Sequence, residues 1–171
     1  MSLYTECGDL MAVGNENWDR WIFATMSKDF NTVFAADFEI FIEGTHRGLP
    51  ENTELLEFRL NGPQRRQPSL GYFILLVQIN ILVRSYMDDD DFHKIRRNVG
   101  KVTNWLADNH CIFRYGDGVD DDDTFLGELH LQNRAKSDPV QVNHFGQIDP
   151  KYRIEEATVE AEFEIHLNEG D

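Results

Sequence analysis

The C-terminal stretch from Ile154 to Leu167 constrains the fold more than any other part of the chain. Apolar and polar side chains alternate through it, and a period of two places each set on one face of a β-strand. A helix, with about 3.6 residues per turn, would scatter the same positions around its axis. The stretch therefore predicts a strand with one buried face and one solvent-exposed, acidic face. It contains no recognisable catalytic motif, which favours a scaffold or assembly protein over an enzyme. The apolar set is Ala157, Val159, Ala161, Phe163, Ile165 and Leu167.

The charge balance limits the partners that the chain can bind. Its 171 residues fit one domain with one hydrophobic core. There are 31 acidic side chains against 16 basic ones, for a formal net charge of −15. Phosphate contacts need clustered lysine and arginine, so this balance argues against a freestanding nucleic-acid binder. A net negative charge of this size is consistent with a soluble surface, with binding to a basic partner, or with a surface that must not adhere to DNA.

Cysteine usage and hydropathy indicate a soluble protein in a reducing compartment. Cys7 and Cys111 are the only cysteines, and no CxxC motif or Cys/His cluster accompanies them. Structural zinc and redox chemistry are therefore unsupported, and we expect no cofactor. The first residues, Met1–Val13, contain acids and no basic segment, so they do not read as a signal peptide. The longest apolar run, Tyr72–Val83, is too short to span a bilayer as a helix.

Two segments have helical periodicity. The first is Asn15–Phe34, in which apolar residues including Trp18 and Met26 recur at helical spacing. The second is Asp88–His110, where an aspartate of the Asp88–Asp91 run is expected to cap the helix. Residues 1–14 before the first helix have no clear period and are expected to form an arm, which leaves 15–171 as the folded domain. The apolar stripe of the second helix consists of Phe92, Ile95, Val99, Val102 and Leu106.

Several further segments read as strands. Asp37–Glu43 alternates, and a strand through Leu56 and Leu60 is expected to end at an Asn61–Pro63 turn. Gln64–Ser69 reads as an exposed polar loop. After it, Phe73–Val83 has an unbroken odd-numbered apolar face and would span roughly 40 Å at about 3.3 Å per residue. Three shorter segments are expected to be strands near Cys111–Tyr115, Phe125–Leu131 and Val140–His144, with a turn at Gly146–Lys151 before the terminal strand.

This order of elements predicts an α+β fold. Strands joined by short turns pair antiparallel, and the two helices each have one apolar face to bury. We therefore expect a mainly antiparallel, twisted sheet with two principal helices packed on one face.

Two runs of aspartates are the most prominent candidates for cation binding. Asp88–Asp91 is better explained as a helix start. The length from Asp117 to Glu128 suits an EF-hand loop, but Val119 stands at its third position and Asp122 at the sixth, where glycine is required. We expect a solvated loop there, and no metal site. Histidines lack ligand spacing and serines lack a GxSxG context, so we identify no catalytic residue and expect no enzyme.

One basic patch and one acidic face are the candidate contact surfaces. Lys94, Arg97 and Lys101 share the polar side of the second helix, and the ordinary interpretation is a solvated helix face. The functional interpretation is a docking stripe for an acidic surface on another copy of the chain, because charge complementarity sets the register between subunits. The candidate acidic surface is the wet face of the terminal strand, with Glu160, Glu162 and Glu164.

The arrangement of elements resembles the tail-terminator and neck proteins of long-tailed bacteriophages. The elements that carry the resemblance are the helix at Trp18–Phe30, the strand Phe38–Glu43, the long strand Phe73–Val83, the helix Asp88–Leu106 and the strand Ala157–Leu167. The resemblance implies a structural virion protein whose copies form a ring at the head–tail junction and let DNA pass. It implies contacts with other neck and tail proteins, no specific DNA binding and no membrane, with location in the virion and in the host cytoplasm during assembly.

Two other interpretations remain open from the sequence. An acidic DNA mimic would inhibit a basic DNA-binding protein through a continuous strip of carboxylates, which the basic residues of the second helix interrupt. A calcium-binding accessory module would use the loop at Asp120–Asp123 and would melt at a higher temperature with calcium.

Overall fold

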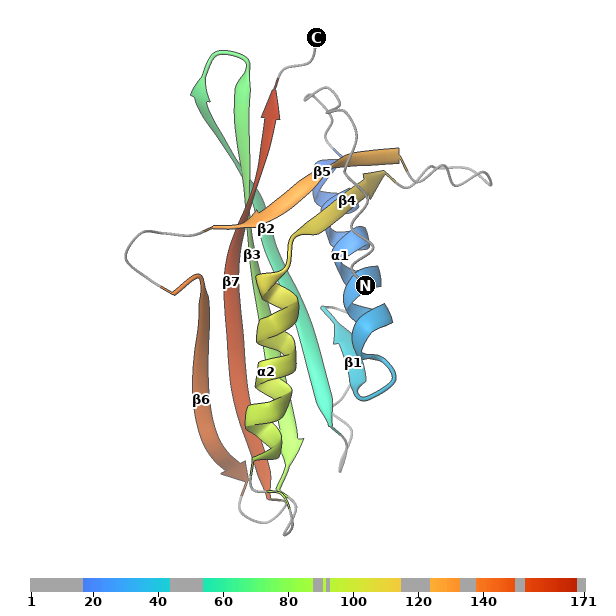
Figure 1. Cartoon of the computed structure of the whole chain (residues 1–171), viewed down its shortest axis with the longest axis vertical. Helices are drawn as coiled ribbons and strands as arrows, with labels where there is room; N and C mark the ends of the chain where they lie inside the picture. Colours follow the sequence, from blue (N-terminus) through green and yellow to red (C-terminus); the bar gives the residue numbers. More distant parts are fainter. Residues whose placement is uncertain are drawn as a thin grey trace.

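The computed structural model describes residues 17–43, 54–87, 91, 93–114, 124–132, 138–149 and 153–168. These residues form two helices and a seven-stranded sheet, which confirms the α+β class (Figure 1). The elements are α1 (Trp18–Phe34), β1 (Glu39–Ile42), β2 (Leu55–Ser69), β3 (Tyr72–Tyr86), α2 (Lys94–Ala107), β4 (His110–Arg114), β5 (Thr124–Leu131), β6 (Val140–Asp149) and β7 (Ile154–Asn168).

The sheet is mixed and is organised around β3 and β7. Its strand order is β1-β2-β3-β7-β5-β4, and β6 also pairs with β7. Strand β1 runs parallel to β2, whereas the other pairings are antiparallel. β3 and β7 pair from Tyr72↔Asn168 to Tyr86↔Ile154. On its other side β7 pairs with β6 along residues 154–161, and with the end of β5 at Phe163 and Glu164.

Period-two alternation was read correctly in the two long strands. Every odd-numbered residue of β3 from Phe73 to Val83 is buried, and so is every odd-numbered residue of β7 from Ala157 to Leu167. The even-numbered residues of both strands are mostly half-buried. Facing residues in register therefore share a face, which produces one apolar surface across the two strands.

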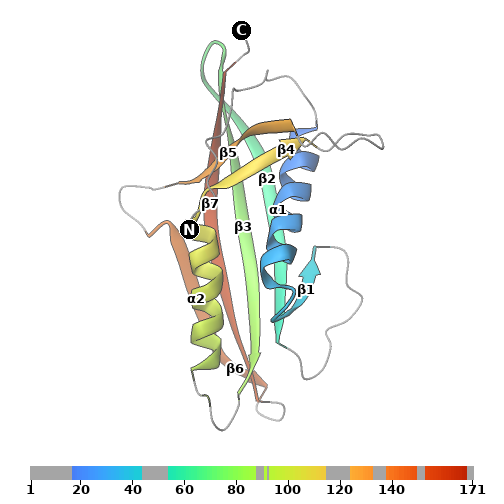
Figure 2. The same ribbon diagram turned by 45° about the vertical axis from the view of Figure 1, so that its right-hand side comes forward.

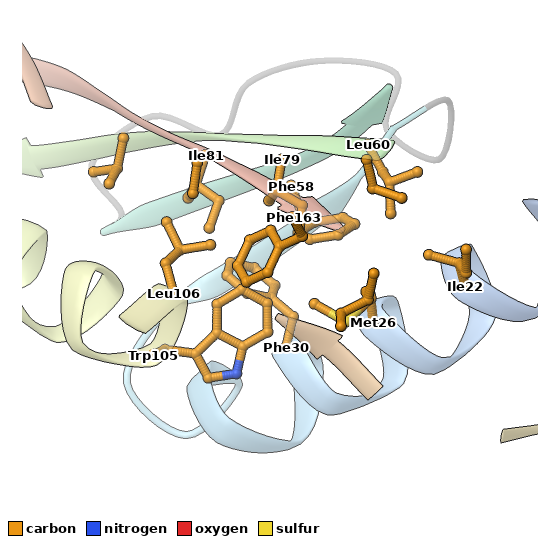
Figure 3. Close-up of a cluster of buried hydrophobic side chains, with 14 of the residues drawn as sticks. Ile22, Met26, Phe30, Phe58, Leu60, Ile79, Ile81, Trp105, Leu106 and Phe163 are labelled. Carbon is orange, nitrogen blue, oxygen red and sulfur yellow. The ribbon is translucent and has the colours of Figure 1, made fainter. Parts of the chain in front are cut away.

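Both helices bury their apolar stripes in the same core as these strands. From α2, four of the five expected stripe residues are buried: Ile95, Val99, Val102 and Leu106. The fifth, Phe92, lies outside the described residues. At the centre of the core, the ring of Phe30 from α1 lies 5.2 Å from the ring of Phe58 and 5.2 Å from that of Trp105, between centroids (Figure 3). Aromatic contacts at this separation add to the burial of apolar area.

The prediction of a turn at Asn61–Pro63 and a loop at Gln64–Ser69 was wrong. β2 continues to Ser69 with an irregular register between Asn61 and Gln64, and the reversal occurs at Leu70–Gly71. β1 accompanies β2 only as far as Phe58. Beyond that point the outer edge of β2 has no strand beside it in the described sheet, so Pro63 can stand in the strand without a sheet neighbour there that needs its missing N–H.

Two other element boundaries also differ from the prediction. α2 begins at Lys94 and ends at Ala107, so His110 opens β4 instead of closing the helix. The N-cap is His93, and no side chain caps the helix there. β6 continues to Asp149 through an irregularity at Gly146, whose φ is +71°. The expected turn from Gly146 is therefore a bulge inside a strand.

The expected N-terminal arm, the first residues assigned to the first helix, residues 88–90 and the loop with Asp120–Asp123 lie outside the described residues.

Candidate functional site

Each of the three expected basic residues on α2 has an acidic partner on its own chain. Nζ of Lys94 lies 2.8 Å from Oε1 of Glu54, and Nζ of Lys101 lies 2.6 Å from Oδ2 of Asp37. The third, Arg97, pairs with Asp91. The positive charge of these three side chains is therefore balanced locally in the folded chain.

A buried polar cluster holds α2 on the sheet. The side-chain amide of Asn98 donates a 2.8 Å hydrogen bond to Oε2 of Glu54 and another of 2.8 Å to the hydroxyl of Ser85 on β3. Oε1 of the same glutamate accepts the backbone N–H of Tyr86 at 3.1 Å. Because Glu54 also pairs with Lys94, one carboxylate connects the first turns of α2 to the end of β3.

The three expected glutamates share the outward face of β7. Glu160 faces Asn80 in register, Glu162 faces Gln78 and Glu164 faces Leu76. All three are half-buried. The carboxylate of Glu164 contacts the His166 ring at 3.0 Å and accepts a 3.2 Å hydrogen bond from Gln132. Side chains alternate along a strand, so the glutamates lie on the side of β7 opposite the core that α2 covers.

The outer part of the β2–β3 hairpin carries positive charge that no described carboxylate balances, whereas Arg59 and Arg84 nearer the body pair with Glu57 and Glu156. Residues 58–87 contain four arginines and no acid, in a chain with 31 acids. The guanidinium of Arg65 lies 3.7 Å from the centroid of the Phe73 ring. Neither Arg65 nor Arg66 forms an ion pair with another described residue. At the tip, the side chain of Leu70 is 98% exposed, and the hairpin projects past the ends of both helices (Figures 1 and 2).

A hollow in the described part of the molecule lies between α1, β4 and the end of α2. It has a volume of about 450 Å³, and its lining residues include Met26, Val33, Phe113, Trp105, Asp29 and Asp108. We call it the α1–β4 groove. β4 is held beside α1 by Thr25, whose hydroxyl donates to the backbone carbonyl of Phe113 at 3.3 Å and accepts its N–H at 3.2 Å.

Asp29 is a partly buried carboxylate in the wall of the α1–β4 groove. Its Oδ2 accepts a 2.9 Å hydrogen bond from the indole N–H of Trp105 and lies 3.4 Å from Nδ1 of His110. Burial disfavours the ionised form, but the hydrogen bonds from His110 and Trp105 and the charge of His110 outweigh it and lower the pKa of Asp29 below 3.8. Among the described contacts, Oδ1 of Asp29 has no partner.

The second ring nitrogen of His110 is not accessible to a substrate. Nε2 of His110 is buried and lacks a hydrogen-bond partner among the described residues. The His110 ring packs against Trp105 and Phe163, with centroids 4.5 Å and 5.7 Å away. A general base must reach the proton that it abstracts, and this nitrogen faces packed side chains instead. The groove therefore combines the negative charge of Asp29 with apolar walls.

The described residues contain no group of three or more His, Cys, Asp or Glu side chains that could hold a metal ion. No helix among them is long and apolar enough to cross a membrane. No protein-family model matches the chain, and no curated protein matches it significantly in sequence.

Sequence reasoning missed the hairpin arginines and the α1–β4 groove as candidate sites. The hairpin arginines could have been found from the sequence, because residues 58–87 contain no acid in a chain that is otherwise rich in acids. The groove gave no such signal, since Asp29 and His110 are separated by 80 residues of sequence and meet only when α1 packs beside β4.

Proposed function

We propose that this protein is a structural virion protein of a tailed bacteriophage. In this proposal its copies form a ring at the head–tail junction, as a tail terminator or a neck connector, which joins the tail tube to the head and lets DNA pass. The resemblance in the order of elements supports it, and those elements occur as α1, β1, β3, α2 and β7. Its partners are other copies and other neck and tail proteins, in the virion and in the host cytoplasm during assembly, and it has no catalytic role.

The observation that carries the self-assembly part of this proposal is the separation of charge within one subunit. The outer part of the β2–β3 hairpin, with the unbalanced Arg65 and Arg66 and no acid beyond Glu57, projects from a body whose net charge is strongly negative. Copies with opposite charges on different surfaces attract in a head-to-tail arrangement, because the positive surface of one meets the negative surface of the next. Head-to-tail contacts generate a ring when the rotation between neighbours closes.

The basic residues of α2 and the glutamates of β7 also suit a head-to-tail arrangement of copies. Lys94, Arg97 and Lys101 lie on the solvent side of α2, whereas Glu160, Glu162 and Glu164 lie on the far side of the sheet. In-chain pairing does not prevent an exchange of partners, since the side chains of Lys101 and Asp37 are 50% and 61% exposed. Exposed ion pairs contribute only about 0–1 kcal/mol, so a neighbouring subunit can compete for them.

The proposal also specifies which face of the sheet the helices cover. We infer that both helices cover one face of a twisted sheet and leave the other face of β3 and β7 open to neighbouring subunits. The half-buried glutamates of β7 and the amides of Asn80 and Gln78 support this view, because polar side chains in register on one face indicate contact with water or with a polar partner.

The net charge is consistent with passage of DNA without specific binding. A surface with excess carboxylates repels phosphate at short range, and the repulsion is strongest where water is restricted. In the proposed ring, acidic side chains face the lumen, while the hairpin arginines are used in contacts between subunits.

The decisive experiment is the absolute mass of the purified protein by light scattering across a concentration series. A closed oligomer, or reversible growth toward one, is the expected result, and a monomer at all concentrations contradicts it. Lys101→Glu and Glu160→Lys should each weaken association, and the double exchange should restore part of it if the two residues face each other between subunits. Glu39→Lys, on the exposed part of β1, is the control with the same change of charge and should leave association unchanged.

A further inference from the structure

The tip of the β2–β3 hairpin combines an exposed apolar side chain with positive charge. Leu70 and Gly71 form the whole connection between two 15-residue strands, and Gly71 has a φ of +76°. The antiparallel pairing continues to Ser69↔Tyr72, so the tip is held on a strand ladder. Leu70 is 98% exposed, and Arg65 and Arg66 precede it on β2 in the same hairpin.

The α1–β4 groove has the complementary features. Its walls contain apolar and aromatic side chains from Met26, Val33 and Phe113. Oδ1 of Asp29 has no partner among the described residues, and the exposed Asp108 adds a second carboxylate against one lysine, Lys28. A volume of about 450 Å³ accepts several side chains, and pockets of about 300–1,000 Å³ are typical for bound ligands.

The tip and the groove of one chain lie apart. In both orientations of the molecule the hairpin extends beyond β4 and β5, away from the surface between α1 and β4 (Figures 1 and 2). A contact between them therefore requires two copies. Such a contact joins different surfaces of the two subunits, so that each copy offers one tip and one groove and can bind a neighbour on either side.

We infer that the α1–β4 groove receives the hairpin tip of a second copy of this chain, with Leu70 against the apolar walls and arginine near Asp29 and Asp108. Burial of an aliphatic side chain and approach of unlike charges both favour this contact. The inference rests on the proposed self-assembly and assigns one specific contact to it.

The contact can be tested through a thiol that already lines the groove. Cys111 is half-buried there. In a Cys7→Ser background, Leu70→Cys should form intermolecular disulfides with Cys111 when the assembled protein is treated with a mild oxidant. Because each copy carries one tip and one groove, the products should form a ladder of covalent oligomers. Peptide mass spectrometry should identify a 70–111 linkage, and the ladder should disappear when Cys111→Ser is added.

Ile148→Cys on β6 is the matched control, because Ile148 is another exposed apolar residue, with an exposure of 45%. In the same background it should give no linkage to Cys111. A second measurement needs no thiol: Leu70→Asp should weaken association by about ten- to a hundredfold, the factor expected for loss of one buried leucine side chain. Leu70→Met, which keeps an apolar side chain, should retain association within about threefold.

The outcomes separate this inference from the proposed function. An oligomer by light scattering with no 70–111 linkage, or with 70–70 linkage alone, overturns the inference and leaves the ring proposal standing. Unchanged association of Leu70→Asp also overturns it. A protein that is monomeric at every concentration contradicts both.

Discussion

The indole N–H of Trp105 donates a 2.9 Å hydrogen bond to Oδ2 of Asp29 and thereby joins the last turn of α2 to α1. The two residues are far apart in sequence, and the contact exists only because both helices enter one core. It stabilises an ionised carboxylate at the wall of the α1–β4 groove, so the packing of the helices and the charge of the groove depend on each other.

Replacing Trp105 with Phe should raise the pKa of Asp29 toward 3.8, because one of the hydrogen bonds that favour the ionised form is lost. In the native protein the depressed pKa contributes stability that is fully present above pH 3.8 and is lost as the pH falls through the depressed value. In the variant, this pH-dependent contribution should be lost at a higher pH than in the native protein. The variant should also be less stable at neutral pH by about 1 kcal/mol. NMR titration of the Asp29 carboxyl group and urea unfolding measure the two effects.

Trp18→Phe is the control for that prediction. Trp18 is as buried as Trp105, at 6% against 7% exposure, but its indole N–H has no hydrogen-bond partner among the described residues. The control should leave the pKa of Asp29 unchanged. An equal shift in both variants would mean that loss of ring volume, and not the hydrogen bond, controls the carboxyl group.

Asn98→Ala should destabilise the protein by about 1–3 kcal/mol, because the buried hydroxyl of Ser85 and Oε2 of Glu54 both lose a donor. Chemical unfolding monitored by circular dichroism measures the change. Asn104→Ala removes the same side chain from the exposed side of α2 and should change stability by less than about 0.5 kcal/mol. Similar losses in the two variants would argue against the buried cluster as the anchor of α2.

Substitution of alanine for glycine should change the stability of the protein in opposite directions at two positions. A Cβ at Gly62 would lie 2.7 Å from the backbone oxygen of Leu76, and the φ of Gly62 is +110°, so Gly62→Ala should destabilise by about 1–3 kcal/mol. A Cβ at Gly100, inside α2, meets no atom within 4 Å. Gly100→Ala should therefore stabilise the protein by about 0.5–1 kcal/mol through helix propensity. Thermal melting of both variants tests the pair, and a stable Gly62→Ala protein would contradict the described path of β2.

Phe30→Ala should destabilise the protein by about 3–5 kcal/mol, because it leaves a cavity among Phe34, Phe58 and Trp105. The control is Phe145→Ala on β6, where the side chain is 58% exposed and the expected loss is within about 0.5 kcal/mol. Urea midpoints compare the two variants directly. A large loss at Phe145 would show that this side chain is covered in solution, for example by a neighbouring copy.

Elements with strong periodicity were predicted well from the sequence. The buried face of β7 and the odd-numbered face of β3 were identified residue by residue, because burial of one face imposes its period on the sequence. On α2 the four described residues of the expected stripe are buried, but the buried Trp105 was not among those expected. The boundaries were less accurate. Asn61–Gly62–Pro63 has the composition of a turn, but a strand can contain it where no neighbour needs the missing N–H of proline.

The candidate sites were predicted less completely. The glutamates of β7 lie on one outward face as expected, and Lys94, Arg97 and Lys101 lie on α2 as expected. Their partners Glu54, Asp91 and Asp37 come from other segments, and charge counts along the chain do not indicate such pairs. The role of the basic helix face and of the acidic strand face in assembly stays a prediction.

The sequence by itself determined which residues are buried on each long element, because the hydrophobic effect acts on side chains whose spacing follows from backbone geometry alone. Only the tertiary structure decided which charges are balanced and where the α1–β4 groove forms. Those properties depend on distances of a few ångströms between residues as far apart as Asp29 and His110, and Coulomb and hydrogen-bond energies depend on such distances.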